Sequence, residues 1–410
     1  MKINYLKISG FKSIQNVEIK DVSPFMVLAG ANGTGKSNFV DALAFLSKVI
    51  DMGVSKAVSE FGGVENLIGL KHNNSGNISY KIEFEIEEQV YQYGISIFLN
   101  NLISRISSES LKILKDEQII FDSDKIREKL EANQESNTSG DLIGAGLLGA
   151  LGGLIWSELK DNDQIGQDII NGVAIGIGLK LLTDEKYSSD ESFLRQNKEF
   201  QGLRNVKIFR IDPFTIKNRR STTNNPGELN RDGSNIAAVL EKFEKDNELR
   251  EQIIEWMSVI VPEMQKLSVQ KQEIDDSKGL FFEEDSGNRF PAHMVSDGTI
   301  YALCLLVAVL TRVKQPGITI IEEPERGLHP KAISELIGFI REYVSPHHPI
   351  ILTTHSESVV RSLELEELYF VSKSQGKTQI KDVRKSGVDK NKIPLDTAWL
   401  TNLLGGGLPW

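Results

Sequence analysis

Residues 30–37, GANGTGKS, form a glycine-rich octet whose residue types could hold phosphate groups. An apolar stretch precedes the octet, and a helix is expected to begin at its end. The backbone can turn its N–H groups toward phosphate oxygens at three glycines, Gly30, Gly33 and Gly35. Lys36 supplies positive charge for these oxygens, and the Ser37 hydroxyl suits Mg²⁺. The octet therefore predicts a nucleotide phosphate site, with a chance glycine-rich turn as the alternative.

Residues 318–330, ITIIEEPERGLHP, bring two adjacent carboxylates to the end of an apolar stretch. A phosphate-binding loop needs acids at the end of a neighbouring strand. We expect Glu322 to hold Mg²⁺, directly or through water, and Glu323 to orient or deprotonate an attacking water. A solvated strand end is the alternative interpretation of the pair.

Two further stretches carry weaker signals. Residues 294–313, MVSDGTIYALCLLVAVLTRV, place Ser296 at the head of a very apolar helix, where a hydroxyl is a good N-cap and a helix start can bind an anion. Residues 349–358, PIILTTHSES, end a strand in His355, which could donate to a γ-phosphate. Each has a plain alternative, a capped core helix and a solvent-facing histidine.

The order of these segments resembles the RecF/SMC/OLD-like branch of the ATP-binding-cassette ATPases, which are P-loop ATPases of the AAA type. VSDGT (295–299) stands where that family has its signature, IIEEPE (320–325) at Walker B and GLHP (327–330) at the D-loop. His355 stands at the switch histidine. The resemblance covers about 1–120 and 205–385.

The resemblance implies an α/β fold, a P-loop NTPase of ABC-ATPase type with a mixed sheet, an antiparallel β-subdomain and a helical insert. It implies that ATP and Mg²⁺ are the cofactors and that ATP is hydrolysed to ADP and phosphate. The implied catalytic residues are Glu323, Glu322 and His355. The implied metal ligands are Ser37 and Glu322. The implied nucleotide-binding residues are Gly30, Asn32, Gly33, Thr34, Gly35, Lys36, Ser37, Asn38, Lys12, Ser296 and Gly298.

Some positions depart from the family pattern. Asp297 replaces a signature glycine, Thr299 replaces a glutamine, and Glu322 replaces the usual aspartate. No Q-loop glutamine can be assigned, although FGGVENLIGL (61–70) lies roughly where it should be. These departures do not favour a transporter subunit.

Four ranges are expected along the chain. The first ATPase lobe, 1–122, carries the P-loop, and period-two alternation over 78–122 predicts antiparallel strands. A helical, glycine-rich apolar insert spans 123–204. A second ATPase lobe at 205–385 carries the signature, Walker B, D-loop and switch histidine, and a C-terminal tail spans 386–410. Within these ranges we expect an exposed helix over 186–204 and one continuous helix over 235–260.

The insert contains two apolar glycine-rich runs, LIGAGLLGALGGLIW (142–156) and IGQDIINGVAIGIGLKLL (165–182). Small-residue faces allow close packing within the chain or against identical copies. Membrane contact is a second interpretation, although each run is short for a bilayer span. A partner-binding or regulatory insert is the third.

Two polar segments leave alternatives open. KNRRSTTNNPGELNRDGSN (217–235) is basic and could meet nucleic-acid phosphates, or it could be a solvated loop. The pair His347-His348 could suggest a metal, but a loop between a helix and a strand is the simpler account.

Composition limits the classes of protein. The chain has 410 residues, 40% of them hydrophobic, a formal net charge of −10 and one cysteine. The net charge excludes a uniformly basic nucleic-acid surface. The lone cysteine and the lack of an apolar leader favour a cytoplasmic protein, and no membrane partner is expected.

Two functions are compatible with these features. The chain resembles the stand-alone OLD-like ATPases of bacterial antiphage systems such as Septu and PARIS. That resemblance implies a homodimer or higher oligomer with composite ATP sites, which acts as a sensor or scaffold for a separate effector, a nuclease or a toxin. The alternative is a RecF-like clamp in DNA repair that closes on nucleic acid when ATP binds.

Overall fold

The protein was analysed as a computed structural model that describes residues 1–69, 76–125, 128, 190–218, 227–243, 246–262, 264–271, 278–390 and 392–404. Contacts divide the chain into two units. Unit 1 comprises Met1–Val22, Ser37–Val206 and Lys373–Ile380, and unit 2 comprises Ser23–Lys36, Lys207–Ser372 and Lys381–Trp410. The phosphate loop up to Lys36 therefore groups with the acids of residues 318–330 rather than with the β-subdomain.

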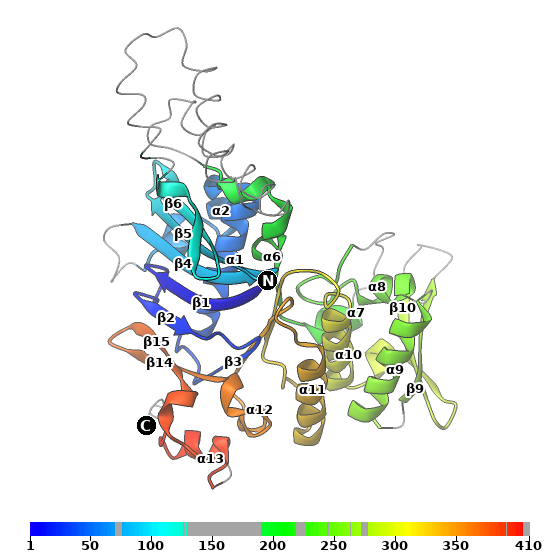
Figure 1. Cartoon of the computed structure of the whole chain (residues 1–410). Coiled ribbons are helices and arrows are strands. Elements are labelled where there is room, and N and C mark those ends of the chain that lie inside the picture. The colour runs from blue at the N-terminus through cyan, green and yellow to red at the C-terminus, as the bar shows by residue number, and fades with distance from the viewer. Residues whose placement is uncertain are drawn as a thin grey trace. The chain divides into compact units, whose positions relative to one another are not determined.

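Unit 1 is built on an antiparallel sheet in the order β2-β1-β4-β5-β6-β7 (Figure 1). Its central strands β4 and β5 alternate buried and less buried side chains, because one face of each packs on the core. Their bounds are β1 Lys2–Ser9, β2 Val17–Lys20, β4 Asn77–Ile86, β5 Gln89–Leu99, β6 Ser104–Lys115 and β7 Gln118–Asp122. The antiparallel strands predicted over 78–122 are thus confirmed.

The helices described in unit 1 are mostly short. Apart from α1, which begins at the end of the phosphate loop, they are single turns or few-turn segments. Their bounds are α1 Lys36–Met52, α2 Val54–Glu60, η1 Val64–Asn66, η2 Phe193–Gln196, η3 Lys198–Phe200 and α6 Gln201–Arg204.

Most strands of the second sheet belong to unit 2, and its order is β15-β14-β3-β13-β12-β8. Its centre is parallel, since β3 pairs in parallel with β13 and β14, and β13 with β12. All five residues are buried in each of β3, β12 and β13, as expected where both faces are covered. The bounds are β3 Phe25–Ala29, β8 Val206–Phe209, β12 Ile318–Glu322, β13 Ile350–Thr354, β14 Leu368–Ser374 and β15 Lys377–Asp382.

This strand order determines which candidate site residues lie at the same edge of the sheet. β13 lies between the strand that leads into the phosphate loop and the strand that ends at the two glutamates. Because parallel strands end on the same edge of a sheet, the loop after β3, the acids after β12 and His355 after β13 share one edge.

The helices of unit 2 pack around an apolar core, and α10 is the most buried of the helices that the structure describes there. Their bounds are α7 Pro213–Asn218, α8 Ile236–Phe243, α9 Asn247–Ile260, α10 Asp297–Leu310, α11 Pro330–Tyr343, α12 Glu357–Arg361 and α13 Leu395–Leu400. A small sheet, β11-β10-β9, completes the unit with β9 Met264–Lys271, β10 Lys278–Glu284 and β11 Arg289–Pro291. Short 3₁₀ turns lie at η4 Ala292–Met294, η5 Leu365–Glu367 and η6 Val383–Ser386.

Two helix predictions were wrong. The exposed helix expected over 186–204 is, in its described part, a series of short turns with buried Leu194 and Phe200. The helix expected over 235–260 is two helices, α8 and α9, because the side chain of Asp246 accepts a hydrogen bond from the Leu249 N–H and starts a new helix.

Of the other predicted ranges, one lies largely outside the described residues and another is partly described. The glycine-rich runs at 142–156 and 165–182 lie outside the described residues, so the three interpretations of the insert stay open. Part of the range 386–410 is core, since Trp399 stacks on Phe370 at a ring distance of 5.8 Å. Within the described ranges, none of the helices is long and apolar enough to cross a membrane.

Candidate functional site

The phosphate loop is shaped by three glycines. Gly33 and Gly35 have φ angles of 77° and 107°, which side chains larger than hydrogen rarely adopt. A Cβ on Gly30 would lie 2.2 Å from the carbonyl oxygen of Val371, so only glycine fits between the loop and β14. The predicted strand, loop and helix are therefore present in this part of the chain.

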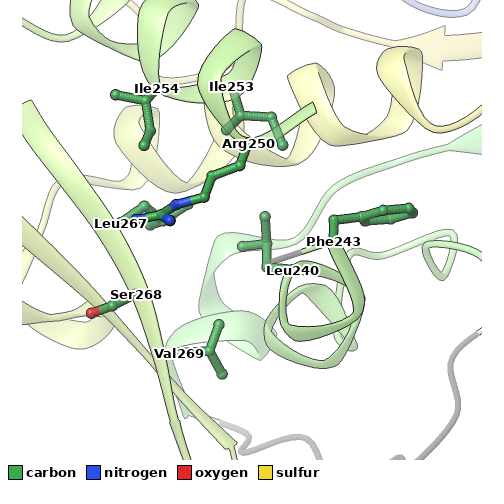
Figure 2. Close-up of a pocket in the computed structure, with 8 residues that line it drawn as sticks. All are labelled: Leu240, Phe243, Arg250, Ile253, Ile254, Leu267, Ser268 and Val269. Carbon is green, nitrogen blue, oxygen red and sulfur yellow. The ribbon is translucent and has the colours of Figure 1, made fainter. Parts of the chain in front are cut away.

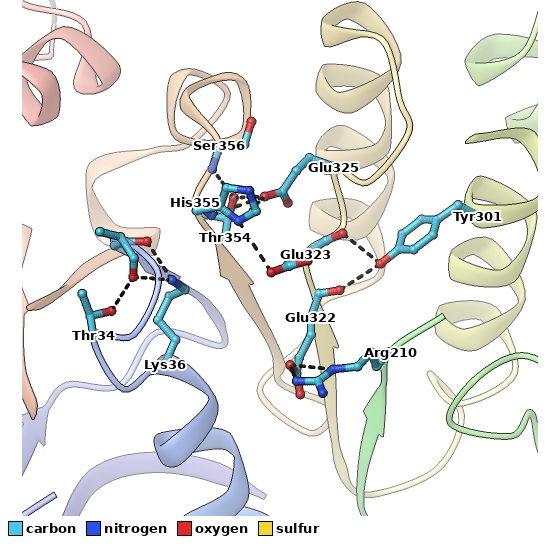
Figure 3. A network of polar contacts seen from close by, with 12 residues as sticks. Thr34, Lys36, Arg210, Tyr301, Glu322, Glu323, Glu325, Thr354, His355 and Ser356 are labelled. Atoms are coloured by element: carbon cyan, nitrogen blue, oxygen red, sulfur yellow. Dashed lines mark hydrogen bonds and ion pairs between the residues drawn. The ribbon is translucent and has the colours of Figure 1, made fainter. Parts of the chain in front are cut away.

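Lys36 is folded back onto its own loop. Its Nζ donates to the carbonyl oxygens of Gly30 at 2.7 Å and Ala31 at 3.0 Å (Figure 3). The side chain is buried, and burial lowers the pKa of Lys36 while the negative charges of Glu323 and Glu325 act in the opposite direction. The ammonium group thus lies among oxygens that an incoming phosphate could replace.

The two glutamates at the end of β12 have different environments, because Glu322 is the last residue of the buried strand and Glu323 lies in the turn that follows it. Glu322 is 5% exposed, whereas the Glu323 side chain is 46% exposed. Glu323 has a φ of 54°, a left-handed conformation that costs a non-glycine residue about 1–2 kcal/mol. Such strain persists where surrounding contacts hold it in place.

Tyr301 of α10 supplies one of those contacts. Its hydroxyl lies 2.8 Å from the backbone oxygens of both Glu322 and Glu323, and its single proton is shared between them (Figure 3). Burial raises the pKa of Tyr301, so the hydroxyl remains a donor at neutral pH. The Glu323 N–H also donates to the Thr353 oxygen at 2.8 Å.

His355 faces two carboxylates. Its Nδ1 lies 3.6 Å from Glu323 Oε1 and 3.7 Å from Glu325 Oε1. Glu325 also accepts hydrogen bonds from the Thr354 hydroxyl at 2.8 Å and the His355 N–H at 3.3 Å. Burial raises the pKa of Glu325, and these hydrogen bonds partly offset that effect.

Glu322 is held by arginines. Arg210 Nε donates to Glu322 Oε2 at 3.1 Å, and Arg210 Nη2 contacts the same oxygen (Figure 3). Arg231 Nη2 lies 3.7 Å from Glu322 Oε1. Arg231 was considered from the sequence as a contact for nucleic acid, but here it faces an acid of its own chain.

The head of α10 forms as predicted. The Ser296 hydroxyl accepts a hydrogen bond from the Thr299 N–H at 3.0 Å. Gly298 is pressed against the turn after β12, since a Cβ there would lie 2.2 Å from the oxygen of Gly327. Lys217 forms an ion pair with Asp297. Ser296 and Asp297 are exposed, whereas Gly298 is buried.

Comparison with known proteins fits this geometry. Residues 25–148 and 112–361 match the family model described as "AAA domain, putative AbiEii toxin, Type IV TA system". The chain belongs to this family of AAA-type ATPase domains. The head domain of an SMC protein, solved with the C-winged helix domain of ScpA, has a TM-score of 0.52 and 15% identity, over 93% of this chain and 97% of that one. The predicted AAA-type family is thus confirmed by the family model, and the likeness to an SMC head is a likeness of fold.

Two other similarities are more limited. An SMC head with coiled coil and joint from Pyrococcus yayanosii has a TM-score of 0.48 and 13% identity, over 98% of this chain and 99% of that one. UvrABC system protein A of Chlamydia trachomatis serovar D is 31% identical over 71 residues, which are 17% of this chain and 4% of that protein. The matched stretch is thus a small part of that relative's length.

Within this AAA-type ATPase, unit 2 brings together most of the predicted site. Lys36, Glu323 and His355 surround one edge of the sheet, and Thr34 Oγ1 closes the loop by donating to the Ala31 oxygen at 2.9 Å (Figure 3). Asn32 is exposed at the tip of the loop. The roles of these residues toward nucleotide stay predictions.

Three predicted residues group with unit 1 instead. Lys12 pairs with Asp41 at 2.6 Å, and Asn38 Nδ2 donates to the Ser13 hydroxyl at 2.6 Å. Ser37 is the first residue of unit 1 after Lys36. Their nucleotide and metal contacts therefore stay predictions.

Three residues of the site were not predicted. Glu325 carried a sequence signal, because it follows the acid pair within the same quoted motif. Tyr301 and Arg210 carried none, since their contacts depend on which helix and strand lie beside β12.

The acids fit the requirements of Mg²⁺. Oε1 of Glu322 and Oε2 of Glu325 are buried and accept no hydrogen bond from the described residues. Carboxylate oxygen is the ligand type that Mg²⁺ prefers, and one or two carboxylates with phosphates and waters are a usual set. Among the residues that the structure describes, no group of three or more His, Cys, Asp or Glu could hold a metal by itself.

Other candidate features of unit 2 are structural. His348 is buried, with Nε2 2.7 Å from the Thr319 hydroxyl and Nδ1 2.8 Å from the Gln315 oxygen, so both nitrogens are satisfied without metal. An apolar pocket between α8, α9 and β9 measures about 20 Å³, enough for one water (Figure 2). It is lined by Leu240, Phe243, Arg250, Ile253, Ile254, Leu267, Ser268 and Val269.

Proposed function

We propose that the chain binds ATP with Mg²⁺ and hydrolyses it to ADP and phosphate. The observation that carries the proposal is the shared sheet edge, where Lys36 follows β3, Glu323 follows β12 and His355 follows β13. Membership of an AAA-type ATPase family supports the same activity.

The residues have distinct roles in this proposal. Lys36 exchanges its bonds to Gly30 and Ala31 for phosphate oxygens. Glu323, half exposed at a strained position, orients and deprotonates the attacking water, and His355 donates to the γ-phosphate. Ser37 and Glu322 would hold Mg²⁺, which would offset the phosphate charge.

Loss of Lys36 tests the activity. Lys36→Ala is expected to weaken binding of a fluorescent ATP analogue by at least about 100-fold and to abolish phosphate release, because the buried ammonium is the main cation of the loop. Unchanged nucleotide affinity in a folded Lys36→Ala chain would refute the phosphate site.

We further propose that copies of the chain associate through composite ATP sites, with Ser296 and Gly298 of one copy facing the nucleotide of another. In this proposal the oligomer acts as a sensor or scaffold for a separate nuclease or toxin in bacterial antiphage defence. The family description names a putative toxin of a type IV toxin–antitoxin system, which is compatible with such a context. The exposure of Ser296 is compatible with a contact in trans.

The DNA clamp is less favoured. Its basic segment was expected at 217–235, but Lys217 pairs with Asp297 and Arg231 faces Glu322. These charges are already compensated within the chain, which reduces the positive surface available to phosphates.

A native pull-down distinguishes the two roles. The Glu323→Gln chain is purified with ATP, and its native mass, bound proteins and bound nucleic acid are determined. A stoichiometric protein partner without nucleic acid supports the scaffold. Nuclease-protected DNA without a protein partner contradicts the scaffold and supports the clamp.

A further inference from the structure

The geometry points to a function for Arg210 and Arg231 that the ATPase site does not itself require. We propose that they form a guanidinium clamp that competes with Mg²⁺ for Glu322, so that metal binding has to open the clamp. The inference rests on the proposed function, because Glu322 is taken there as the acid that meets Mg²⁺.

The clamp is asymmetric. Arg210 uses both Nε, at 3.1 Å, and Nη2 on Glu322 Oε2. Arg231 approaches the other oxygen, Oε1, to 3.7 Å, which is an ion pair without a hydrogen bond. Oε1 is buried and accepts no hydrogen bond from the described residues, so it is the oxygen that a cation can take first.

Backbone contacts bring the two arginines together. Arg210 directly follows β8, the neighbour of β12 at the edge of the sheet. Its N–H donates to the oxygen of Arg231 at 2.8 Å, and the Asp212 N–H donates to the oxygen of Asp232 at 3.0 Å. The two chain segments are thereby paired, and both guanidinium groups lie within ion-pair distance of Glu322.

The charge balance opposes a further cation at Glu322. One buried carboxylate faces two guanidinium groups, so its negative charge is already balanced before Mg²⁺ approaches. The arginine side chains are 54% and 56% exposed, against 5% for Glu322, so they can turn to solvent at small cost while the acid stays in place. Metal binding would therefore require that the arginine side chains move away from Glu322.

The two possible roles of Arg210 predict opposite changes in metal affinity when the residue is lost. If Arg210 only holds Glu322 in the conformation that binds metal, its loss should weaken metal binding. If it competes with the metal, its loss should strengthen metal binding. The sign of the change in metal affinity therefore decides between the two roles.

The experiment is a Mn²⁺ titration of the ADP-bound full chain, followed by electron paramagnetic resonance. Arg210→Gln and Arg231→Gln are each expected to bind Mn²⁺ more tightly, by roughly 3- to 30-fold, because one nearby positive charge is removed. Arg210→Lys keeps the charge and should stay within about threefold of wild type. Arg250→Gln removes an exposed positive charge of α9 and should bind as wild type.

Unchanged or weaker Mn²⁺ binding in folded Arg210→Gln and Arg231→Gln overturns the proposed guanidinium clamp. Failure of both variants to fold also overturns it, since the arginines would then be structural. Binding of a fluorescent ADP analogue in EDTA separates the two proposals. If the wild-type chain binds no nucleotide, the proposed function is refuted. If nucleotide binds normally but the two Gln variants have the Mn²⁺ affinity of the wild type, only the guanidinium clamp is refuted.

Discussion

At the scale of single residues, the two glutamates of the acid pair have separate surroundings. Glu322 is buried and faces arginines, whereas Glu323 is half exposed and faces His355. The difference follows from their adjacent positions at the end of β12, where one residue ends the strand and the next adopts a left-handed φ of 54°. Tyr301 is the side chain best placed to maintain that turn.

Tyr301→Phe tests this positioning role. The variant loses the hydroxyl that lies 2.8 Å from the backbone oxygens of Glu322 and Glu323. We expect kcat for ATP to fall roughly tenfold with KM changed less than about twofold, and stability to fall by about 1–2 kcal/mol. Steady-state kinetics and urea denaturation measure the two effects.

Tyr343→Phe on α11 is the matched control and should keep wild-type kinetics. A Tyr301→Phe chain that loses stability but keeps the wild-type kcat would show that the hydroxyl only supports the fold.

The residues of the phosphate loop could be predicted from sequence because their chemistry is local. GANGTGKS contains its glycines, lysine and hydroxyl within eight consecutive positions. The contacts of Arg210 and Tyr301 could not be predicted, since they join residues 112 and 21–22 positions apart along the chain. Such contacts depend on the order of strands in the sheet, which no local pattern specifies.

At the scale of elements, the turn at the head of α10 and the turn after β12 pack closely against each other at two glycines. Gly298 at the head of α10 and Gly327 after β12 are so close that a Cβ on Gly298 would lie 2.2 Å from the Gly327 oxygen. Neither turn can therefore move without displacing the other. The head of α10 and the turn after β12 are coupled in this way.

Gly298→Ala tests this fit against a matched change. We expect it to lower the free energy of unfolding by about 1–3 kcal/mol, because backbone has to move. Gly338→Ala, on α11, has nothing within 4 Å of its new Cβ and should instead raise stability by up to about 1 kcal/mol. Denaturant titration of both variants measures the changes, and equal effects would contradict the close fit.

Element boundaries were predictable where a cap and a hydrophobic pattern agreed. Ser296 begins α10 as expected from its hydroxyl and the apolar residues that follow. The break between α8 and α9 was missed because Asp246 lies inside a continuous helical pattern, where its capping role competes with helix propensity.

At the scale of the whole molecule, stability should depend on pH through His348. Burial lowers the pKa of His348, and the hydrogen bond from its Nδ1–H to the Gln315 oxygen only partly offsets that effect. The unfolded chain protonates this residue near pH 6.5, before the folded chain does. Stability should therefore fall as pH decreases from about 6.5 toward the lowered pKa of the folded state.

His348→Gln should flatten this pH dependence, even though it lowers stability at neutral pH. His347→Gln, which removes the exposed imidazole beside it, should keep the wild-type slope. Urea denaturation between about pH 5 and 7.5 measures both slopes. An unchanged slope in His348→Gln would contradict the assignment.

The central claim is that this chain hydrolyses ATP with Glu323 as the group that activates water. The most direct measurement is the identity of radiolabelled nucleotide bound to the wild-type and Glu323→Gln chains after incubation with ATP and Mg²⁺. The account predicts ADP and released phosphate with the wild type, and intact bound ATP with Glu323→Gln, whose turnover should be at least about 100-fold slower. The same ADP and phosphate yield from both chains would contradict it.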